Sequence, residues 1–426
     1  DQEVLGSNPS RRTIMSKLFN SFSIFHLLFL SLIIRIFAYY FYGDNELVNE
    51  WEVIIHNYEI TNIFGIHVAV DEYVAETKLA EVGDRVLPSA FMPPLYYYFI
   101  YLIKYFASDL INIADLIIFT QITVSLISIL IFFKILKLLI KKELIIFLTF
   151  IFAFFPINIL AVSQISSVTL QIFFMVNFFY FLFKFENQKK IIYLVLFSIF
   201  SGLLILIRGE FFLFYFLTII YYFFYLKVNF KAILVSIIIT LLMISPYLYK
   251  NYTLFKTITL TKSFGYNLLK GNTPNFKVEG DAIYIEKKHS RENLKIKTDN
   301  KYEINLDNYY KSQAIEYIKN SPIQHAKFYF IKLLSFTFFD INSSYANYYN
   351  VLHIFPKIIL SISSLFGAII SLRKKGLFQY LSFFYFINLL LFSVFFILPR
   401  YSLILLPAQL ILSIKLVKTL KRKLFN

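Results

Sequence analysis

Residues 112–135 read NIADLIIFTQITVSLISILIFFKI, an apolar run with one acid near its start and one lysine near its end. A helix of about 20 apolar residues is long enough to cross the hydrocarbon core of a bilayer. Further stretches of this kind occur at 18–42, 143–162, 167–185, 191–207, 211–226, 231–249, 353–372, 377–398 and 401–418. The sequence therefore predicts an all-α polytopic membrane protein with about ten transmembrane helices.

The composition supports the same fold class. Of 426 residues, 58% are hydrophobic and only 16% are charged, whereas a soluble domain carries about a quarter charged residues. The chain has no Cys, which excludes disulfides and Cys-ligated metals. In a soluble protein the net charge of +16 would indicate nucleic acid, but in a membrane protein it first reflects basic cytoplasmic loops. We expect membrane lipids, and no nucleic acid, as partners.

Two shorter apolar stretches, 93–107 and 323–339, decide the predicted orientation. If both lie flat on the membrane, the basic clusters all fall on one side, whereas counting either one as a span distributes them over both sides. These clusters contain Lys17, Lys134, Lys137, Lys141, Lys142, Lys184, Lys189, Lys190, Lys227, Lys231, Arg373, Lys374, Lys375 and the tail from Lys415 to Lys423. We therefore expect both termini in the cytoplasm and an integral protein of a bacterial inner (plasma) membrane.

Residues 1–426 are interpreted as a single membrane domain. Met15 resembles a natural start, so we interpret residues 1–14 as an upstream or non-native leader. Two predicted extracytoplasmic segments are long. The first, 43–111, contains an interfacial helix, and the second, 250–352, begins with strand-like and polar sequence and continues as an amphipathic helix at 309–320. Loops longer than about 15 residues are usually functional or disordered, so we expect any chemistry on this face.

Carboxylates follow the predicted first span at Asp44, Glu46 and Glu50. Most loop acids are simply solvated. Glu50, however, stands next to Trp51, and a carboxylate set against an aromatic ring in a partly dry site gains proton affinity, which suits a general base. Glu50 is the first candidate for a catalytic base, and Asp44 and Glu46 are its rivals.

Three isolated cations stand at corners of the predicted extracytoplasmic face: Arg208, which precedes Glu210, and Lys250 and Arg400. A charge at the bilayer centre costs about 2.5–3.5 kcal/mol, so such residues are expected at interfaces or in functional cavities. Each can be an ordinary turn residue, or together they can bind an anionic headgroup. Arg35, inside the first span, is expected to extend its long side chain to the outer interface.

No cofactor and no metal site are predicted, although a need for a divalent metal stays open. The six His residues show no i,i+4 pair and no metal-ligand spacing. The sequence also lacks a glycine-rich phosphate loop, which argues against nucleotide binding. A sugar donor used outside the cytoplasm would therefore have to arrive on a lipid.

Taken in order, the polar corners resemble those of the C-type (GT-C) integral-membrane glycosyltransferases, which include dolichyl-phosphate-mannose protein mannosyltransferases and bacterial aminoarabinose transferases. The similar elements extend over nearly the whole chain and are Asn49-Glu50-Trp51, Met92-Pro93-Pro94-Leu95-Tyr96, Arg208-Gly209-Glu210, Pro246-Tyr247-Leu248-Tyr249-Lys250-Asn251, Gly271-Asn272, Ala314 with Tyr317, Ile318 and Pro322, and Arg400-Tyr401. The sequence departs from the family pattern at Gly209, Tyr247 and Lys250, where the family has Pro, Trp and Arg.

The resemblance implies an enzyme that moves a hexose or pentose from a polyprenyl-phosphate donor to an extracytoplasmic hydroxyl of a lipid, glycan or protein, with inversion. A base among Glu50, Asp44 and Glu46 would take the hydroxyl proton, and Arg208, Lys250 and Arg400 would contact the phosphate. The resemblance also implies that Glu210 orients Arg208 or contacts the sugar. Tyr96 and Trp51 would shape the pocket.

Three other functions stay open. A transporter or flippase of lipid-linked sugars would share the membrane burial and the anionic ligand, but such proteins tend to show paired repeats and helices broken at mid-membrane, and neither is clear here. An oligosaccharide polymerase or ligase would also be an enzyme, but it would use a pyrophosphate-linked donor. A non-catalytic assembly subunit would use its loops only for docking.

Overall fold

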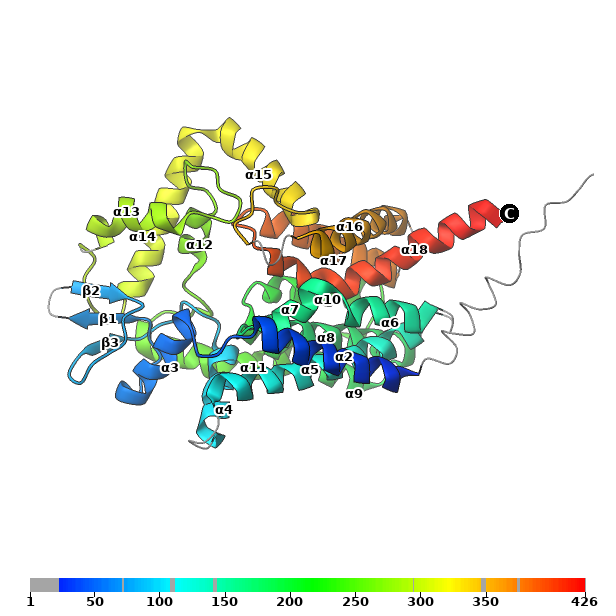
Figure 1. The fold of residues 1–426 in the computed structure, drawn as a ribbon, viewed down its shortest axis with the longest axis horizontal. Helices are drawn as coiled ribbons and strands as arrows, with labels where there is room; N and C mark the ends of the chain where they lie inside the picture. Colours follow the sequence, from blue (N-terminus) through cyan, green and yellow to red (C-terminus); the bar gives the residue numbers. More distant parts are fainter. Residues whose placement is uncertain are drawn as a thin grey trace, which may run out of the picture.

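The computed structural model describes residues 23–70, 73–107, 112–140, 144–293, 295–345, 350–373 and 376–425. The predicted leader, residues 1–14, lies outside these ranges. In the described part, the chain is mainly helical and contains one small sheet (Figure 1). The fold class predicted from the sequence, an all-α polytopic membrane protein, is confirmed.

Each apolar segment expected from the sequence overlaps described helices, and residues 18–22 of the first segment lie outside the described ranges. Within the described residues, six helical runs are long and apolar enough to cross a membrane: α2 (Ile24–Tyr42), α5 (Ile113–Leu139), α8 (Val168–Gln188), α11 (Phe230–Phe255), α16 (Val351–Leu372) and Pro399–Leu420, which joins η2 (Pro399–Leu405) to α18 (Leu406–Phe425). A further segment is a pair bent by 50°, α6 (Ile145–Ala153) and α7 (Pro156–Val162). The others are shorter apolar helices, α9 (Ile191–Ile207), α10 (Phe211–Phe224) and α17 (Leu377–Phe392).

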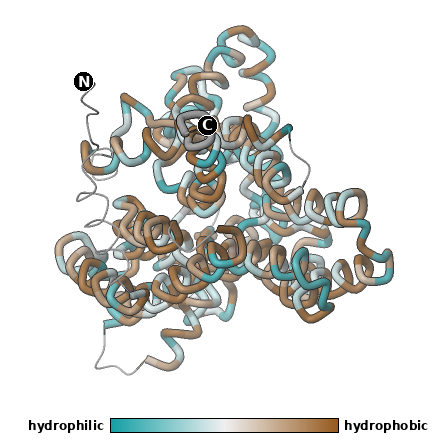
Figure 2. The backbone as a smooth tube through the Cα atoms, turned by 90° about the vertical axis from the view of Figure 1, so that its right-hand side faces the viewer, coloured by the Kyte–Doolittle hydropathy of each residue, from teal (hydrophilic) through white to brown (hydrophobic). Residues whose placement is uncertain are grey.

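These helices pack side by side into a bundle in which α2 begins and α18 ends at the same end (Figure 1). Hydrophobic residues dominate the chain when the bundle is seen end-on (Figure 2). Helix α8 is central, since 78% of the residues in its most apolar 18-residue stretch are buried. Gly202 lets α9 and α11 approach closely, because a Cβ there would lie 2.5 Å from the Cβ of Met243.

The expectation that Arg35 reaches the outer interface is wrong. Its side chain is 1% exposed and turns into the bundle. There Nε donates to Ser125 Oγ at 3.0 Å, and Nη1 donates to the Ser31 carbonyl at 3.2 Å. The inward direction is favoured because serine and backbone oxygens satisfy donors that hydrocarbon would leave unpaired.

The first long segment forms a small layer beyond one end of the bundle (Figure 1). It consists of α3 (Asn49–Thr61), β1 (His67–Val70), β2 (Tyr73–Glu76), β3 (Arg85–Leu87) and α4 (Pro94–Phe106). The sheet is antiparallel with the order β2-β1-β3, and His67 pairs with both Glu76 and Leu87. Helix α4 coincides with the first short apolar stretch; its interfacial position stays a prediction.

The second long segment completes the layer with α12 (Phe264–Lys270), α13 (Ala282–Asn293), α14 (Tyr302–Asn320) and α15 (Pro322–Thr337). The expected strand-like start is wrong, because the described part of this segment is helical or irregular. The amphipathic helix also begins earlier than predicted, at Tyr302. Its buried stripe of Tyr302, Leu306, Tyr310 and Ala314 follows i,i+4 spacing and packs on α12.

Candidate functional site

A cavity of about 580 Å³ lies between the end of the bundle and the outer layer. Its lining includes six of the nine site residues predicted from the sequence: Glu50, Trp51, Tyr96, Arg208, Glu210 and Arg400. These residues come from α3, α4, the corner between α9 and α10, and the start of η2. The fold therefore brings corners from distant parts of the sequence into one space.

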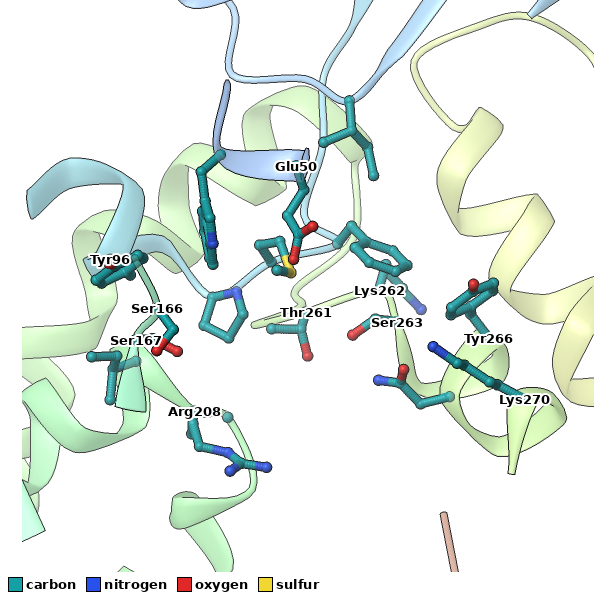
Figure 3. Close-up of a pocket in the computed structure, with 18 of the residues that line it drawn as sticks. Glu50, Tyr96, Ser166, Ser167, Arg208, Thr261, Lys262, Ser263, Tyr266 and Lys270 are labelled. Carbon is teal, nitrogen blue, oxygen red and sulfur yellow. The ribbon is translucent and has the colours of Figure 1, made fainter. Parts of the chain in front are cut away.

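Glu50 stands in the first turn of α3, and Figure 3 shows its carboxylate pointing into the cavity. The neighbouring Trp51 is buried and packs edge-on against Tyr96, with ring centroids 4.7 Å apart. The Tyr96 hydroxyl in turn donates to Gln121 Oε1 at 2.9 Å. Trp51 and Tyr96 thus form a rigid wall, and Glu50 is available to a molecule in the cavity.

The two rival carboxylates lie outside the cavity lining. Asp44 lies directly behind it, since Asp44 Oδ2 accepts the backbone N–H of the lining residue Ile165 at 2.7 Å. Burial raises the pKa of Asp44, while the Ile165 N–H and the charge of Arg400 oppose that rise. Glu46 is exposed. Asp44 is therefore close enough to influence the cavity.

Arg208 is held from several sides. Its Nε donates to Glu210 Oε1 at 2.6 Å, and Nη1 donates to Gln171 Oε1 at 3.3 Å. The guanidinium carbon lies 4.8 Å and 5.1 Å from the ring centroids of Phe392 and Tyr401. An arginine fixed in this way is a preorganised donor for an anion.

A second cationic region lies across the cavity and was not predicted. It contains Lys270, at the end of α12, and Lys262. Burial lowers the pKa of Lys270; the nearby Glu50 opposes the effect and Arg400 adds to it. Lys270 directly precedes the Gly271-Asn272 element of the sequence, which was the one available signal for this region.

Lys250 is not brought to the cavity lining. Helix α11 continues through Pro246 to Phe255, so Lys250 stands on a helix rather than at a corner. Its Nζ lies 3.3 Å from the Tyr98 hydroxyl and 4.8 Å from the centroid of the Phe64 ring. A proline inside a membrane helix is tolerated where neighbours satisfy the freed carbonyl, so it does not have to end the helix.

Two acids of α14 also line the cavity and were missed. Glu303 accepts the Ala90 N–H at 2.7 Å and the Ser89 hydroxyl, and burial raises the pKa of Glu303 to about 8. Asp307 accepts the N–H groups of Gly265 and Tyr266 and so caps the start of α12. The signal was a pair of acids at i,i+4 beside a stripe of buried residues, because such acids must have partners.

No protein-family model and no curated protein matches the sequence. Solved structures do match it. One is the Archaeoglobus fulgidus oligosaccharyltransferase tethered to an acceptor peptide containing the NVT sequon, with a TM-score of 0.54 and 13% identity over 94% of this chain and 50% of that chain. Another is archaeal oligosaccharyltransferase AglB from the same organism with an inhibitory peptide and a dolichol-phosphate, with a TM-score of 0.54 and 14% identity over 95% and 51%.

The chain has the GT-C fold. It spans about half the length of the solved structures it matches. The family resemblance found in the sequence is thereby confirmed at the level of the fold. In this GT-C fold, the described residues contain no group of three or more His, Asp or Glu side chains that could hold a metal ion.

Proposed function

We propose that this chain is a membrane glycosyltransferase that moves a sugar from a polyprenyl-phosphate donor to an extracytoplasmic hydroxyl, with inversion. The observation that carries the proposal is that one cavity at the end of an apolar bundle is lined by Glu50 and by both Arg208 and Arg400. Dolichol-phosphate, seen with the A. fulgidus neighbour, is a lipid of the proposed donor class.

The cations would bind the phosphate and stabilise it as the leaving group. A phosphate diester carries one negative charge, and the departing monoester gains a second. Arg208 is held by Glu210 and Gln171 before any ligand binds, so little reorganisation is needed as this charge develops. Arg400 lines the same cavity and supplies a second cation.

Glu50 would act as the general base. Its carboxylate takes the proton of the acceptor hydroxyl, the hydroxyl oxygen forms a bond to the anomeric carbon, and the bond from that carbon to the phosphate oxygen breaks. The electron pair of the broken bond leaves with the phosphate. Attack from the face opposite the phosphate inverts the anomeric centre. Asp44 is the alternative base, because it lies behind Ile165 and burial raises the pKa of its carboxyl.

The proposed sidedness follows from the distribution of positive charge. The C-terminal half of helix α18 carries Lys415 and Lys418, and this helix ends at the end of the bundle where α2 begins, opposite the outer layer (Figure 1). Basic segments stay preferentially in the cytoplasm. The cavity would then face the extracytoplasmic side of a plasma membrane, beyond the reach of nucleotide sugars.

Mass spectrometry of lipids, glycans and envelope proteins from cells with and without the gene tests this function. We expect the cells without the gene to lack one sugar modification and to accumulate the sugar-bearing polyprenyl phosphate on the outer leaflet. Accumulation confined to the inner leaflet would instead indicate a flippase and would contradict the proposed transfer.

A further inference from the structure

His67 of β1 lines the cavity but has no hydrogen-bond partner on either ring nitrogen. The side chain is only 3% exposed. Its Nε2 lies 3.7 Å from Glu303 Oε2, which is too long for a hydrogen bond. Leaving a buried polar group unpaired costs about 1–3 kcal/mol, so such a group on a cavity wall favours a ligand that can pair with it.

Glu303 complements His67 chemically. Burial raises the pKa of Glu303 to about 8, and it lowers the pKa of His67 to about 4. At neutral pH the pair therefore consists mainly of a carboxylic acid that can donate and an imidazole that can accept. The other charged or titratable groups facing Glu303 are Asp307 on its own helix, Lys262 before α12 and Tyr247 on α11.

The surrounding wall is polar and aromatic. Phe91 and Tyr266 pack edge-on with ring centroids 5.6 Å apart, and both line the cavity. Figure 3 shows Glu50 between two groups of side chains, with Ser166, Ser167 and Arg208 on one side and Lys262, Tyr266 and Lys270 on the other. If the donor phosphate occupies the side of Arg208, the acceptor has to approach from the opposite side.

We propose that His67, Lys262, Tyr266 and Glu303, the acceptor wall, bind a saccharide, so that the attacking hydroxyl belongs to a sugar ring. This inference rests on the proposed function and names its acceptor class. A sugar hydroxyl both donates and accepts, so one oxygen about 2.8 Å from His67 Nε2 and Glu303 Oε2 can bridge their gap. A backbone N–H only donates and a carbonyl only accepts, so neither can bridge this pair. A Ser or Thr hydroxyl can bridge it, but such a side chain brings no ring face to pack on Tyr266. Sugar rings also present apolar faces that pack on aromatic side chains such as Tyr266.

Binding can be measured without turnover, because Trp51 is the only tryptophan in the chain and lines the cavity. The probes are neutral trisaccharides of glucose, galactose and mannose, and an acetylated Asn-Val-Thr amide as the peptide alternative. Both are titrated into purified protein saturated with sugar-free polyprenyl phosphate. We expect at least one trisaccharide to change the Trp51 fluorescence and the peptide to leave it unchanged.

Variants test whether the trisaccharide binds at the acceptor wall. His67→Phe should raise the trisaccharide Kd at least about ten-fold, while Glu316→Gln, an exposed change on α14, should leave it unchanged. Trisaccharide binding to the wild type should weaken as the pH rises through about 8, because Glu303 then loses its donor proton. Glu303→Gln keeps an N–H donor and should bind without that pH dependence, which separates the role in binding from any loss of folding in His67→Phe.

Three outcomes would overturn the inference: fluorescence changes caused by the peptide alone, an unchanged trisaccharide Kd in His67→Phe, or a pH dependence that persists in Glu303→Gln. These failures differ from a failure of the proposed function. If trisaccharides bind at the acceptor wall but no sugar is ever transferred, the proposed saccharide site is supported and the proposed transferase activity is contradicted. If a peptide is glycosylated, the proposed transferase activity is supported and the proposed saccharide acceptor is contradicted.

Discussion

Trp51 and Arg400 line the same cavity, although Trp51 belongs to the helix after the first described span and Arg400 to the start of the last one. The sequence predicts that these corners meet on one side of the membrane. Their common cavity gives Glu50, Arg208 and Arg400 access to the same molecule. Each role proposed for these residues can now be tested separately.

Glu50→Gln should abolish most of the sugar transfer without weakening the binding of the polyprenyl-phosphate donor. An amide of the same shape cannot take a proton, and a general base contributes typically about 10²–10⁴-fold to the rate. Turnover with a polyprenyl-phosphate sugar, and the Kd of sugar-free polyprenyl phosphate, are measured on the purified variant. Glu46→Gln, at an exposed position outside the cavity lining, is the matched control. Full turnover in Glu50→Gln, with loss in Asp44→Asn, would move the base to Asp44.

Arg400→Ala should weaken binding of polyprenyl phosphate. A hydrogen bond to a charged group contributes about 1.5–3 kcal/mol, which corresponds to roughly a 10- to 150-fold rise in Kd. Arg208→Ala should act in the same direction, and it also leaves Glu210 without its partner. Lys250→Ala is the matched control, because Lys250 lies against Tyr98 and Phe64 outside the cavity lining. Equal effects of all three changes would argue against Arg208 and Arg400 as specific phosphate contacts.

The bundle was predicted well because each membrane span is a local run of apolar residues. Such a run can be recognised without knowing which distant residues it contacts. The sequence also selected Arg208 and Arg400, which both line the cavity, because a charge that interrupts apolar sequence is expected at an interface or in a functional cavity. Lys250 shows the limit of this reasoning. Pro246 suggested a corner, but the helix continues and carries the side chain away from the cavity.

The outer layer was predicted less well. Its residues are held by single long-range hydrogen bonds, such as that from the Ala90 N–H to Glu303, and no local pattern encodes such a bond. His67 and Lys262 carry no signal of their own in the sequence. They become candidates only once β1 and the segment before α12 are known to face one cavity.

Lys332 provides a test of how the outer layer is joined to the bundle. Its buried Nζ donates to the Gly271 carbonyl at 2.9 Å, to Asn272 Oδ1 at 3.2 Å and to the Val394 carbonyl at 3.1 Å. Lys332→Met removes this donor from all three acceptors, of which the Val394 carbonyl keeps its hydrogen bond from Asn272 Nδ2. The change should lower the free energy of unfolding by on the order of 1–3 kcal/mol. Melting temperatures in detergent are compared with Lys327→Met, an exposed change on the same helix. Equal melting temperatures would contradict the role of Lys332.

The same residue predicts a pH dependence. Burial lowers the pKa of Lys332 from its ordinary value of 10.5 to about 7. Between these values the unfolded chain binds more protons than the folded protein, so the contribution of this group to stability rises with pH. The difference in melting temperature between the wild type and Lys332→Met should therefore widen from pH 7 toward pH 10. A difference that narrows over this range would show that the folded protein keeps Lys332 charged.

The sidedness of the cavity can be measured directly because the chain has no native Cys. Ser166→Cys and Ser263→Cys place single thiols on opposite walls of the cavity. Both should react with a membrane-impermeant maleimide from outside the cell, and polyprenyl phosphate should protect at least the first. Lys418→Cys, at the other end of the bundle, should react only after permeabilisation. Labelling of the two cavity thiols from opposite sides would exclude a single extracytoplasmic site.

Sugar transfer by the purified protein is the most direct test. The protein is reconstituted in liposomes with polyprenyl phosphates that carry radiolabelled sugars and with candidate acceptors, and the anomeric configuration of the product is determined. We expect release of the polyprenyl phosphate, a product of inverted configuration and a loss of at least about 100-fold in Glu50→Gln. A wild-type protein that moves the intact sugar lipid across the bilayer without breaking its bond to the sugar would contradict the proposed transferase.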